Sequence, residues 1–412
     1  MVLPAAPVQY SSRDGERPYH ADRELYYVTG STEPDSVAVL SGGDEPRLTL
    51  FVRDRDPEAE LWSGPRLGVN GATERFRPNA CHPVSELQAL LPELLGQGDR
   101  LFFRLGRGDA LETSVIEALG QARSRGVRTG TGPRAVVDPG EVLDDLRLVK
   151  DPYEVETIRH AASISLDGHR AGAGVIAPGV GEWAVEAALD GAFRASGGNG
   201  PAFETIVGSG KNACVLHYVA NRGVIAEDAL VLVDAGAGYG LYSGDVTRTY
   251  PSGGHFTGPQ RDIYQVVEGA RRAAVSAVEP GASIGSVHDA ATRTLVEGLV
   301  ALGVLSGDAD DIVANDRHKP FFPHQTSHWL GLDVHDPGDY ARGGVSRVLE
   351  PGMVFTVEPG LYFRPGLESG GFSGIGVRLE DDVVVTADGC EVLTAGLPTD
   401  IDEVEALVGS LR

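Results

Sequence analysis

The stretch "VDAGAGYGLYSGDVTRT", residues 233–249, contains two aspartates, Asp234 and Asp245, within a predicted pair of antiparallel strands. With the turn at Tyr239 and Gly240, the two aspartates lie directly opposite each other. Opposed side chains have Cβ atoms roughly 5 Å apart, and two like charges at that spacing destabilise the pair. Either both carboxylates face solvent, or a positive group such as a divalent cation lies between them.

Histidines gather in a second stretch, "HQTSHWLGLDVHD", residues 324–336. This stretch holds three of the chain's 11 histidines, namely His324, His328 and His335. A single histidine in such a run is most often a hydrogen-bonded core residue. Three of them so close together favour a functional role over that default.

Two glutamates occupy strand positions where burial is expected. Glu358 ends the apolar run of "EPGMVFTVEPG", and Glu380 in "GIGVRLEDD" shares a predicted strand face with Arg378, because strand side chains alternate with period two. A buried glutamate costs several kcal/mol unless it is paired or binds a metal ion. Arg378 offers Glu380 such a pairing without metal, so Glu380 alone leaves both interpretations open.

Two aspartates, one histidine and two glutamates form an oxygen-rich donor set with one nitrogen. Such a set suits Mn²⁺, Co²⁺ or Zn²⁺ better than copper or an iron–sulfur cluster. Five ligands for two ions require bridging carboxylates, and ions in bridged sites lie roughly 3.5–4 Å apart. The set therefore predicts a site for two cations that keeps positions open for water.

Composition narrows the classes of protein. A length of 412 residues predicts two domains, and a formal charge of −24 argues against a nucleic-acid partner. The sequence shows neither a basic segment followed by an apolar run at its start nor a membrane-length apolar stretch, so we expect a cytoplasmic protein without a membrane partner. Three scattered cysteines, Cys81, Cys214 and Cys390, predict neither a disulfide framework nor a zinc knuckle.

Residues 1–145 predict a small α/β domain, because strand-like runs at 36–40 and 48–52 alternate with helix-like stretches such as 84–95. Residues 146–412 predict an α+β domain. It opens with a helix that Asp151 caps and Pro152 begins, and further helices are expected at about 260–279 and 285–302. Its predicted strands are "ALVLVDAG", "MVFTVEPG" and "VRLEDDVVVT".

These stretches, together with "PAFETIVGSGKNACVLHY" at 201–218, resemble the M24 "pita-bread" metallopeptidases in order and approximate spacing, and most closely the aminopeptidase P branch. "ELYYVTGSTEP" and "AELWSGPRLG" extend the resemblance to the amino-terminal domain. It implies a pita-bread catalytic domain behind a creatinase-N-like α/β domain. It also implies that five residues bind two divalent ions, with Asp245 and Glu380 bridging: Asp234, Asp245, His328, Glu358 and Glu380.

The resemblance implies roles for other residues as well. His217 would contact substrate near the scissile nitrogen, and His324 and His335 would orient the substrate and stabilise the oxyanion. Arg378 matches the arginine beside the final glutamate ligand. Trp62 matches a tryptophan that reaches toward a neighbouring subunit's site in related oligomers, which implies a homo-oligomer, a dimer or a tetramer.

The implied reaction is removal of the first residue from a peptide whose second residue is proline. A metal-bridging hydroxide would attack, Glu358 would carry its proton to the departing nitrogen, and His335 would help to stabilise the oxyanion. Mn²⁺ is the expected ion, with Co²⁺ and Zn²⁺ as alternatives. Two other functions stay open: a prolidase that cleaves only Xaa-Pro dipeptides, and a non-catalytic peptide-binding protein with the same fold. A metal-free creatinase-like hydrolase is disfavoured, because all five ligands are present.

Overall fold

A computed structural model describes residues 1–13, 15–368 and 370–410. The chain divides into two compact units, Met1–Leu143 and Asp144–Arg412, and each is described by itself. Within the described residues, no helix combines the length and the apolar composition needed to cross a bilayer. Helix α6, Gly140–Leu148, begins in the first unit and ends in the second.

The first unit is built on a four-stranded sheet in the order β1-β2-β3-β4, antiparallel except for the parallel pair β3–β4. The strands predicted at 36–40 and 48–52 are β2 and β3. The other predicted element, the helix at 84–95, is a short 3₁₀ turn at Val84–Glu86 followed by α4. The strands are β1 (Val2–Pro4), β2 (Val37–Ser41), β3 (Arg47–Val52), β4 (Ala80–Pro83), and the parallel pair β5 (Arg100–Phe102) and β6 (Ala135–Val137). The helices are α1 (Arg23–Thr29), α2 (Pro57–Ser63), α3 (Gly68–Phe76), α4 (Leu87–Gly96) and α5 (Ala110–Gly126).

One of two apolar clusters in this unit joins the sheet to α4 and α5. Phe51 of β3 is fully buried and belongs to one apolar cluster with Leu91 of α4 and Val115 of α5. Burial of such side chains stabilises each by about 1.5–3 kcal/mol. The apolar runs that predicted strands are therefore the residues that hold the helices on the sheet.

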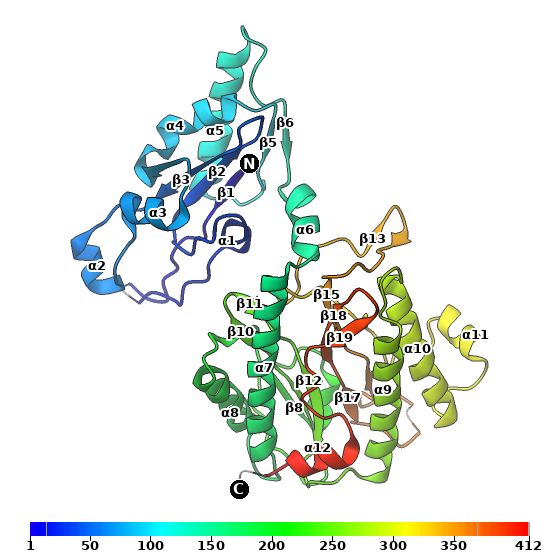
Figure 1. The fold of residues 1–412 in the computed structure, drawn as a ribbon. Coiled ribbons are helices and arrows are strands. Elements are labelled where there is room, and N and C mark those ends of the chain that lie inside the picture. The colour runs from blue at the N-terminus through cyan, green and yellow to red at the C-terminus, as the bar shows by residue number, and fades with distance from the viewer. Residues whose placement is uncertain (14, 369, 411–412) are drawn as a thin grey trace. The chain divides into compact units, whose positions relative to one another are not determined.

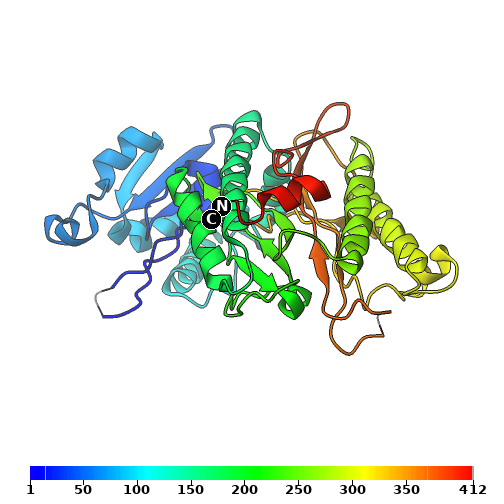
Figure 2. The same cartoon turned by 90° about the horizontal axis from the view of Figure 1, so that it is seen from below.

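The second unit places its strands between two helix pairs, as Figures 1 and 2 show. Helix α7 packs on α8, and α9 packs on α10. α7 begins at Pro152 as predicted, because the Asp151 side chain accepts hydrogen bonds from the backbone of Tyr153 and Glu154. The helices are α7 (Pro152–Val175), α8 (Glu182–Ala195), α9 (Gly258–Ser276), α10 (Ile284–Ala301), α11 (Ala309–Ala314) and α12 (Ile401–Leu407).

The strands of this unit form short antiparallel sheets, among them β12-β9-β8 and β15-β18-β19. The three predicted strand runs correspond to β9, β15 and the pair β17 and β18. The strands are β7 (Gly200–Pro201), β8 (Ile206–Ser209), β9 (Leu230–Asp234), β10 (Ala237–Tyr239), β11 (Tyr242–Ser243), β12 (Thr247–Pro251), β13 (Ala341–Arg342), β14 (Val345–Ser346), β15 (Val354–Val357), β16 (Gly360–Tyr362), β17 (Gly376–Arg378), β18 (Asp381–Val385) and β19 (Cys390–Val392).

The hairpin of residues 233–249 turns one residue later than predicted. Tyr239 pairs with Tyr242, so the turn residues are Gly240 and Leu241, with φ of 56° and 70°. Two-residue hairpin loops of this kind require positive φ at both central positions, which glycine adopts readily and leucine does not. Because leucine rarely adopts this conformation, Leu241 was not recognised in the sequence as a turn residue. The register moves by two residues, and Asp234 pairs with Thr247 instead of lying opposite Asp245.

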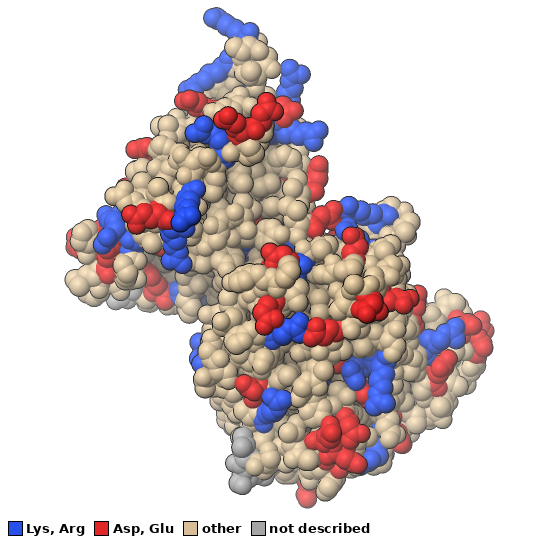
Figure 3. All heavy atoms as spheres, in the orientation of Figure 1, with Lys and Arg blue, Asp and Glu red and all other residues tan. Residues whose placement is uncertain are grey.

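Charged side chains are spread over the face in Figure 3, and acidic ones gather over α12. Asp402 and Glu403 lie in the first turn of that helix, after the capping Asp400. Acidic groups there are favourable, because the amino-terminal end of a helix carries a partial positive charge.

Candidate active site

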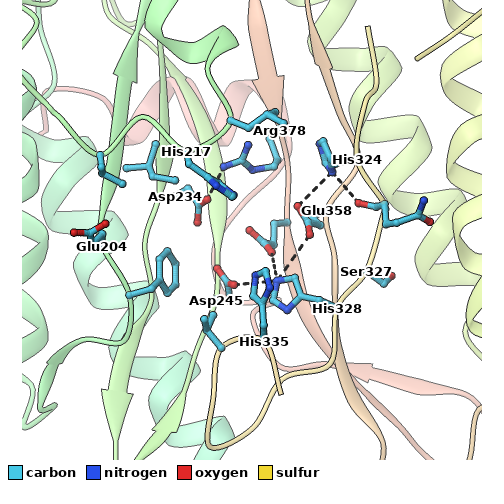
Figure 4. Close-up of a pocket in the computed structure, with 17 residues that line it drawn as sticks. Glu204, His217, Asp234, Asp245, His324, Ser327, His328, His335, Glu358 and Arg378 are labelled. Carbon is cyan, nitrogen blue, oxygen red and sulfur yellow. Dashed lines mark hydrogen bonds and ion pairs between the residues drawn. The ribbon is translucent and has the colours of Figure 1, made fainter. Parts of the chain in front are cut away.

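A pocket of about 490 Å³ lies in the second unit, where the ends of β9, β15 and β17 meet the loop of residues 324–335 (Figure 4). It brings together all of the candidate site residues except Trp62. Its lining consists of Phe203, Glu204, Ile206, Leu216, His217, Val219, Asp234, Asp245, His324, Gln325, Ser327, His328, Val334, His335, Glu358, Arg378 and Glu380.

Three of the four candidate carboxylates face one imidazole in this pocket. His328 Nε2 lies 3.3 Å from Asp245 Oδ2, 3.8 Å from Glu358 Oε1 and 4.0 Å from Glu380 Oε1. One ligand atom from each of Asp245, His328 and Glu380 lies within 4.8 Å of the others. The fourth carboxylate, Asp234, ends β9, the central strand between β8 and β12. Although the predicted register is wrong, Asp234 and Asp245 still line the same pocket.

The electrostatics of this group are unfavourable without a cation. Burial raises the pKa of Asp245 well above its usual range, and Asp234, Asp382 and Glu358 raise it further. Burial also raises the pKa of Glu380, and the charge of Asp245 raises it further. Burial also raises the pKa of Glu358, to about 7. Buried carboxylates that repel one another in this way are stabilised by metal coordination.

Unpaired atoms point to the same conclusion. Asp234 Oδ1 and Asp245 Oδ1 are buried and have no hydrogen-bond partner within the described part of the chain. His328 Nδ1–H donates to the Trp329 carbonyl at 3.3 Å, so Nε2 is the ring nitrogen that faces the carboxylates. A lone pair facing anions needs a cation or a proton between them. The donor set of this chain therefore fits a hard divalent metal ion.

Arg378 does not form the pair with Glu380 that the sequence left open as an alternative to metal binding. Its Nη2 donates to Asp234 Oδ2, and its Nη1 donates to the Tyr362 hydroxyl at 3.0 Å. Glu380 instead accepts a hydrogen bond from Thr247 Oγ1 at 2.6 Å. The suggested Arg378–Glu380 pair is therefore wrong. Arg378 is the last residue of β17, and its guanidinium pairs with Asp234, the last residue of β9.

The outer histidines line the pocket as uncharged groups. Burial and then Arg378 lower the pKa of His324 to about 3. Its Nδ1–H donates to the Gln325 carbonyl at 2.7 Å, so Nε2 accepts from the Tyr362 hydroxyl at 2.8 Å. His335 stacks on His328 with ring centroids 4.1 Å apart, and burial and then His328 lower its pKa. Neutral imidazoles keep one N–H available for donation.

Trp62 lies elsewhere in the chain. It belongs to α2 of the first unit, and 86% of its surface is exposed. All residues that line the pocket belong to the second unit. The substrate-contacting role of Trp62 stays a prediction.

Several residues in the pocket or bonded to its lining were not anticipated. Tyr362, which bonds both His324 and Arg378, lies on β16 just beyond the "VEPG" stretch, and its only sequence signal is that proximity. The apolar wall carries no motif that distinguishes it from core residues: Phe203, Ile206, Leu216, Val219 and Val334.

Comparison with known proteins agrees with this geometry. The sequence pattern of metallopeptidase family M24 matches residues 156–387, and that of the aminopeptidase P amino-terminal domain matches residues 1–102. An Xaa-Pro aminopeptidase of Escherichia coli K12 is 40% identical over 411 residues, which are 99% of this chain and 93% of that protein. The Haemophilus influenzae Xaa-Pro aminopeptidase is 34% identical, covering 96% and 90% of the two chains.

Solved structures match over the same length. The aminopeptidase PepP of Pseudomonas aeruginosa is 41% identical with a TM-score of 0.94, covering 98% of this chain and 92% of its own. A zinc-substituted E. coli aminopeptidase P in complex with product is 40% identical with a TM-score of 0.95, covering 100% and 94%. These matches confirm the predicted α+β pita-bread fold with its amino-terminal α/β domain. The chain therefore belongs to metallopeptidase family M24 and, within it, is a hydrolase of the aminopeptidase P branch.

Proposed function

We propose that this enzyme removes the first residue from peptides whose second residue is proline, using two divalent cations. The cations would be held by five residues, with Asp245 and Glu380 bridging: Asp234, Asp245, His328, Glu358 and Glu380. The observation that carries the proposal is the convergence of four mostly buried carboxylates and His328 on one pocket, with two aspartate oxygens unpartnered. The names of the relatives, Xaa-Pro aminopeptidases, support the substrate class.

The metal ions supply Lewis-acid chemistry when bound, since they lower the pKa of a water toward about 7 and polarise a carbonyl. The chain's own part begins with Glu358. Its side chain is 18% exposed, against 6% for Asp245, 12% for Asp234 and 2% for Glu380, so it is the carboxylate most accessible to substrate. Glu358 would accept the proton of the attacking water and deliver it to the leaving proline nitrogen.

Three histidines complete the proposed machinery. His335 would donate an N–H to the oxyanion, and preorganised donors of this kind stabilise a developing charge strongly. His324, oriented by Tyr362, would position the substrate, and His217 would lie near the scissile nitrogen. The proline nitrogen carries no hydrogen in the scissile bond, so the apolar wall that includes Phe203 must recognise the ring by shape.

The proposal extends to the cellular metal ion, the location and the subunit number. Mn²⁺ as the cellular ion is supported by the oxygen-rich donor set, although the zinc-substituted relative contains another metal. A cytoplasmic location agrees with three free cysteines. A homo-oligomer with Trp62 near a neighbouring site agrees with Leu61 and Trp62, which are 80% and 86% exposed on α2. Light scattering of the wild type and Trp62→Ala tests that part.

A substrate series tests the activity. The Mn²⁺-loaded enzyme should cleave an Xaa-Pro-Xaa tripeptide and leave the matching Xaa-Ala-Xaa peptide intact. Turnover of the Xaa-Pro dipeptide alone would show a prolidase. Absence of cleavage of any Xaa-Pro peptide, in protein that contains two metal ions per chain by mass spectrometry of the metals, would refute the proposal.

A further inference from the structure

We infer that Glu182, a buried carboxylate at the start of α8, is a positioning residue that holds the His217 segment, residues 210–222, against the pocket. Leu216, His217 and Val219 of this segment line the pocket. The inference rests on the proposed function, because it assigns Glu182 an effect on substrate through His217.

Glu182 accepts hydrogen bonds from both ends of the segment. Its Oε1 accepts hydrogen bonds from Ser209 N–H at 2.8 Å, Ser209 Oγ–H at 2.7 Å and Asn212 Nδ2–H at 3.0 Å, all at the segment's beginning. Its Oε2 accepts from Gly223 N–H at 2.6 Å, just past the segment's end. A single side chain therefore closes the loop that carries His217.

The fit at the far end is tight. A Cβ on Gly223 would lie 2.7 Å from Glu182 Oε1, so only glycine lets the backbone approach the carboxylate. The Glu182 backbone N–H also donates to the Gly223 carbonyl at 2.9 Å. Asn221 adds a second anchor, since its side chain accepts from Val207 N–H at 2.9 Å and donates to the Thr205 carbonyl at 2.8 Å. Hydrogen bonds therefore hold both ends of the segment, which together form its base.

The middle of the segment alternates between packed and exposed side chains. Val215 and Val219 are 52% and 43% exposed and His217 is also exposed, whereas Leu216 and Tyr218 pack against the apolar cluster that contains Ala213 and Cys214. Apolar packing therefore holds the residues on either side of His217, and the hydrogen bonds at the base hold the two ends of the segment. These are bonds to a charged acceptor, which are stronger than bonds between neutral groups.

The charge of Glu182 is required by its surroundings. Burial raises the pKa of this carboxyl, but hydrogen bonds from Asn212, Ser209 and Gly223 outweigh burial and hold the pKa below its usual value. Four N–H and O–H donors point at the group. A glutamine would turn its own NH₂ toward one of them, which leaves at least one donor unsatisfied.

The decisive experiment is a double-mutant cycle with the Mn²⁺-loaded full chain. E182Q should lower kcat/KM for an Xaa-Pro-Xaa tripeptide by about 10- to 100-fold, since small misplacements of a positioned group have effects of that size. In the H217A background the same substitution should lower kcat/KM by less than about twofold. E186Q, the same substitution one turn along α8, is the matched control and should change neither background.

Hydrogen exchange of the metal-free protein gives a readout independent of activity. E182Q should speed exchange of backbone amides in residues 210–222, and E186Q should not. Equal losses of kcat/KM with and without His217, or unchanged exchange, would overturn the inference. If E182Q does not fold, N212A, which removes one of the four donors, should show the same pattern with a smaller effect, and its absence would overturn the inference too. A wild type inactive on Xaa-Pro peptides would refute the proposed function, while exchange would still test the anchoring.

Discussion

Replacing Asp245 with asparagine should change stability in opposite directions in the metal-free and the metal-loaded enzyme. Asp245 is 4% exposed, and this burial raises its pKa. The charges of nearby carboxylates raise the pKa further. Asparagine has nearly the same shape without the charge. In the metal-free protein the substitution therefore removes repulsion, whereas in the loaded protein it removes a charged ligand.

The structure sets the size of the effect. Ligand atoms of Asp245 and Glu380 lie within 4.8 Å of each other, and two like charges at that separation repel by about 3 kcal/mol at an effective dielectric constant of about 20. Protonation of the wild-type carboxyl relieves part of this repulsion, so we expect D245N to gain about 1–2 kcal/mol without metal. In a domain of this size, that gain raises Tm by roughly 2–8 °C. With Mn²⁺ at 100 times its Kd, the wild type gains about 2.7 kcal/mol. We expect the variant, which lacks a charged ligand, to gain less than about 0.7 kcal/mol, so the order of stability reverses.

Differential scanning calorimetry in EDTA and in excess Mn²⁺ measures both differences. D262N, on the exposed surface of α9, is the matched control and should melt with the wild type under both conditions. The reasoning is refuted if D245N melts below the wild type in EDTA and gains as much from Mn²⁺ as the wild type does. Turnover of D245N should be abolished in either case.

Four further outcomes are expected. His328→Ala should lose bound metal and all turnover while staying folded. EDTA should inactivate the wild type until Mn²⁺ or Co²⁺ is returned. Metal analysis and peptide assays check both outcomes. Burial lowers the pKa of His169 from 6.5 to about 4, so the stability that neutral His169 contributes is complete above pH 6.5 and lost as the pH falls toward 4. His169→Gln should remove about 3 kcal/mol of that pH dependence, measured by urea unfolding between pH 4 and 7. Tyr362→Phe removes the hydroxyl that bonds His324 and Arg378, which should lower kcat/KM about tenfold without changing metal content.

Each outcome has a contrary result. Full activity of the wild type after prolonged chelation, or of His328→Ala, would count against the metal site. An unchanged pH dependence in His169→Gln would show that another group titrates. Metal loss in Tyr362→Phe would mean that Tyr362 supports the metal ligands instead of the substrate.

Local signals in the sequence predicted the helices α4, α7, α9 and α10 and the strands β2, β3, β9, β15, β17 and β18. α7 begins at Pro152 because Asp151 and Glu154 form a capping box that involves only four consecutive residues. The strand runs were recognisable because their apolar side chains are buried on both faces, as in β9 and β15. The hairpin register was not predicted, since it depends on Leu241 adopting a positive φ against its own preference. The pairing of β9 with β12 outweighs that preference.

The kinds of side chain in the pocket were readable from the chain alone, because motif stretches carry the aspartates, glutamates and histidines as neighbours. Their partnerships were not readable. Arg378 pairs with Asp234 across 144 positions, and Glu182 reaches Gly223 across 41. Propensity and capping act over a few residues, whereas ion pairs and hydrogen bonds depend on distance through space. Folding alone sets those distances, and so it also determines which carboxylates repel one another strongly enough to need a cation.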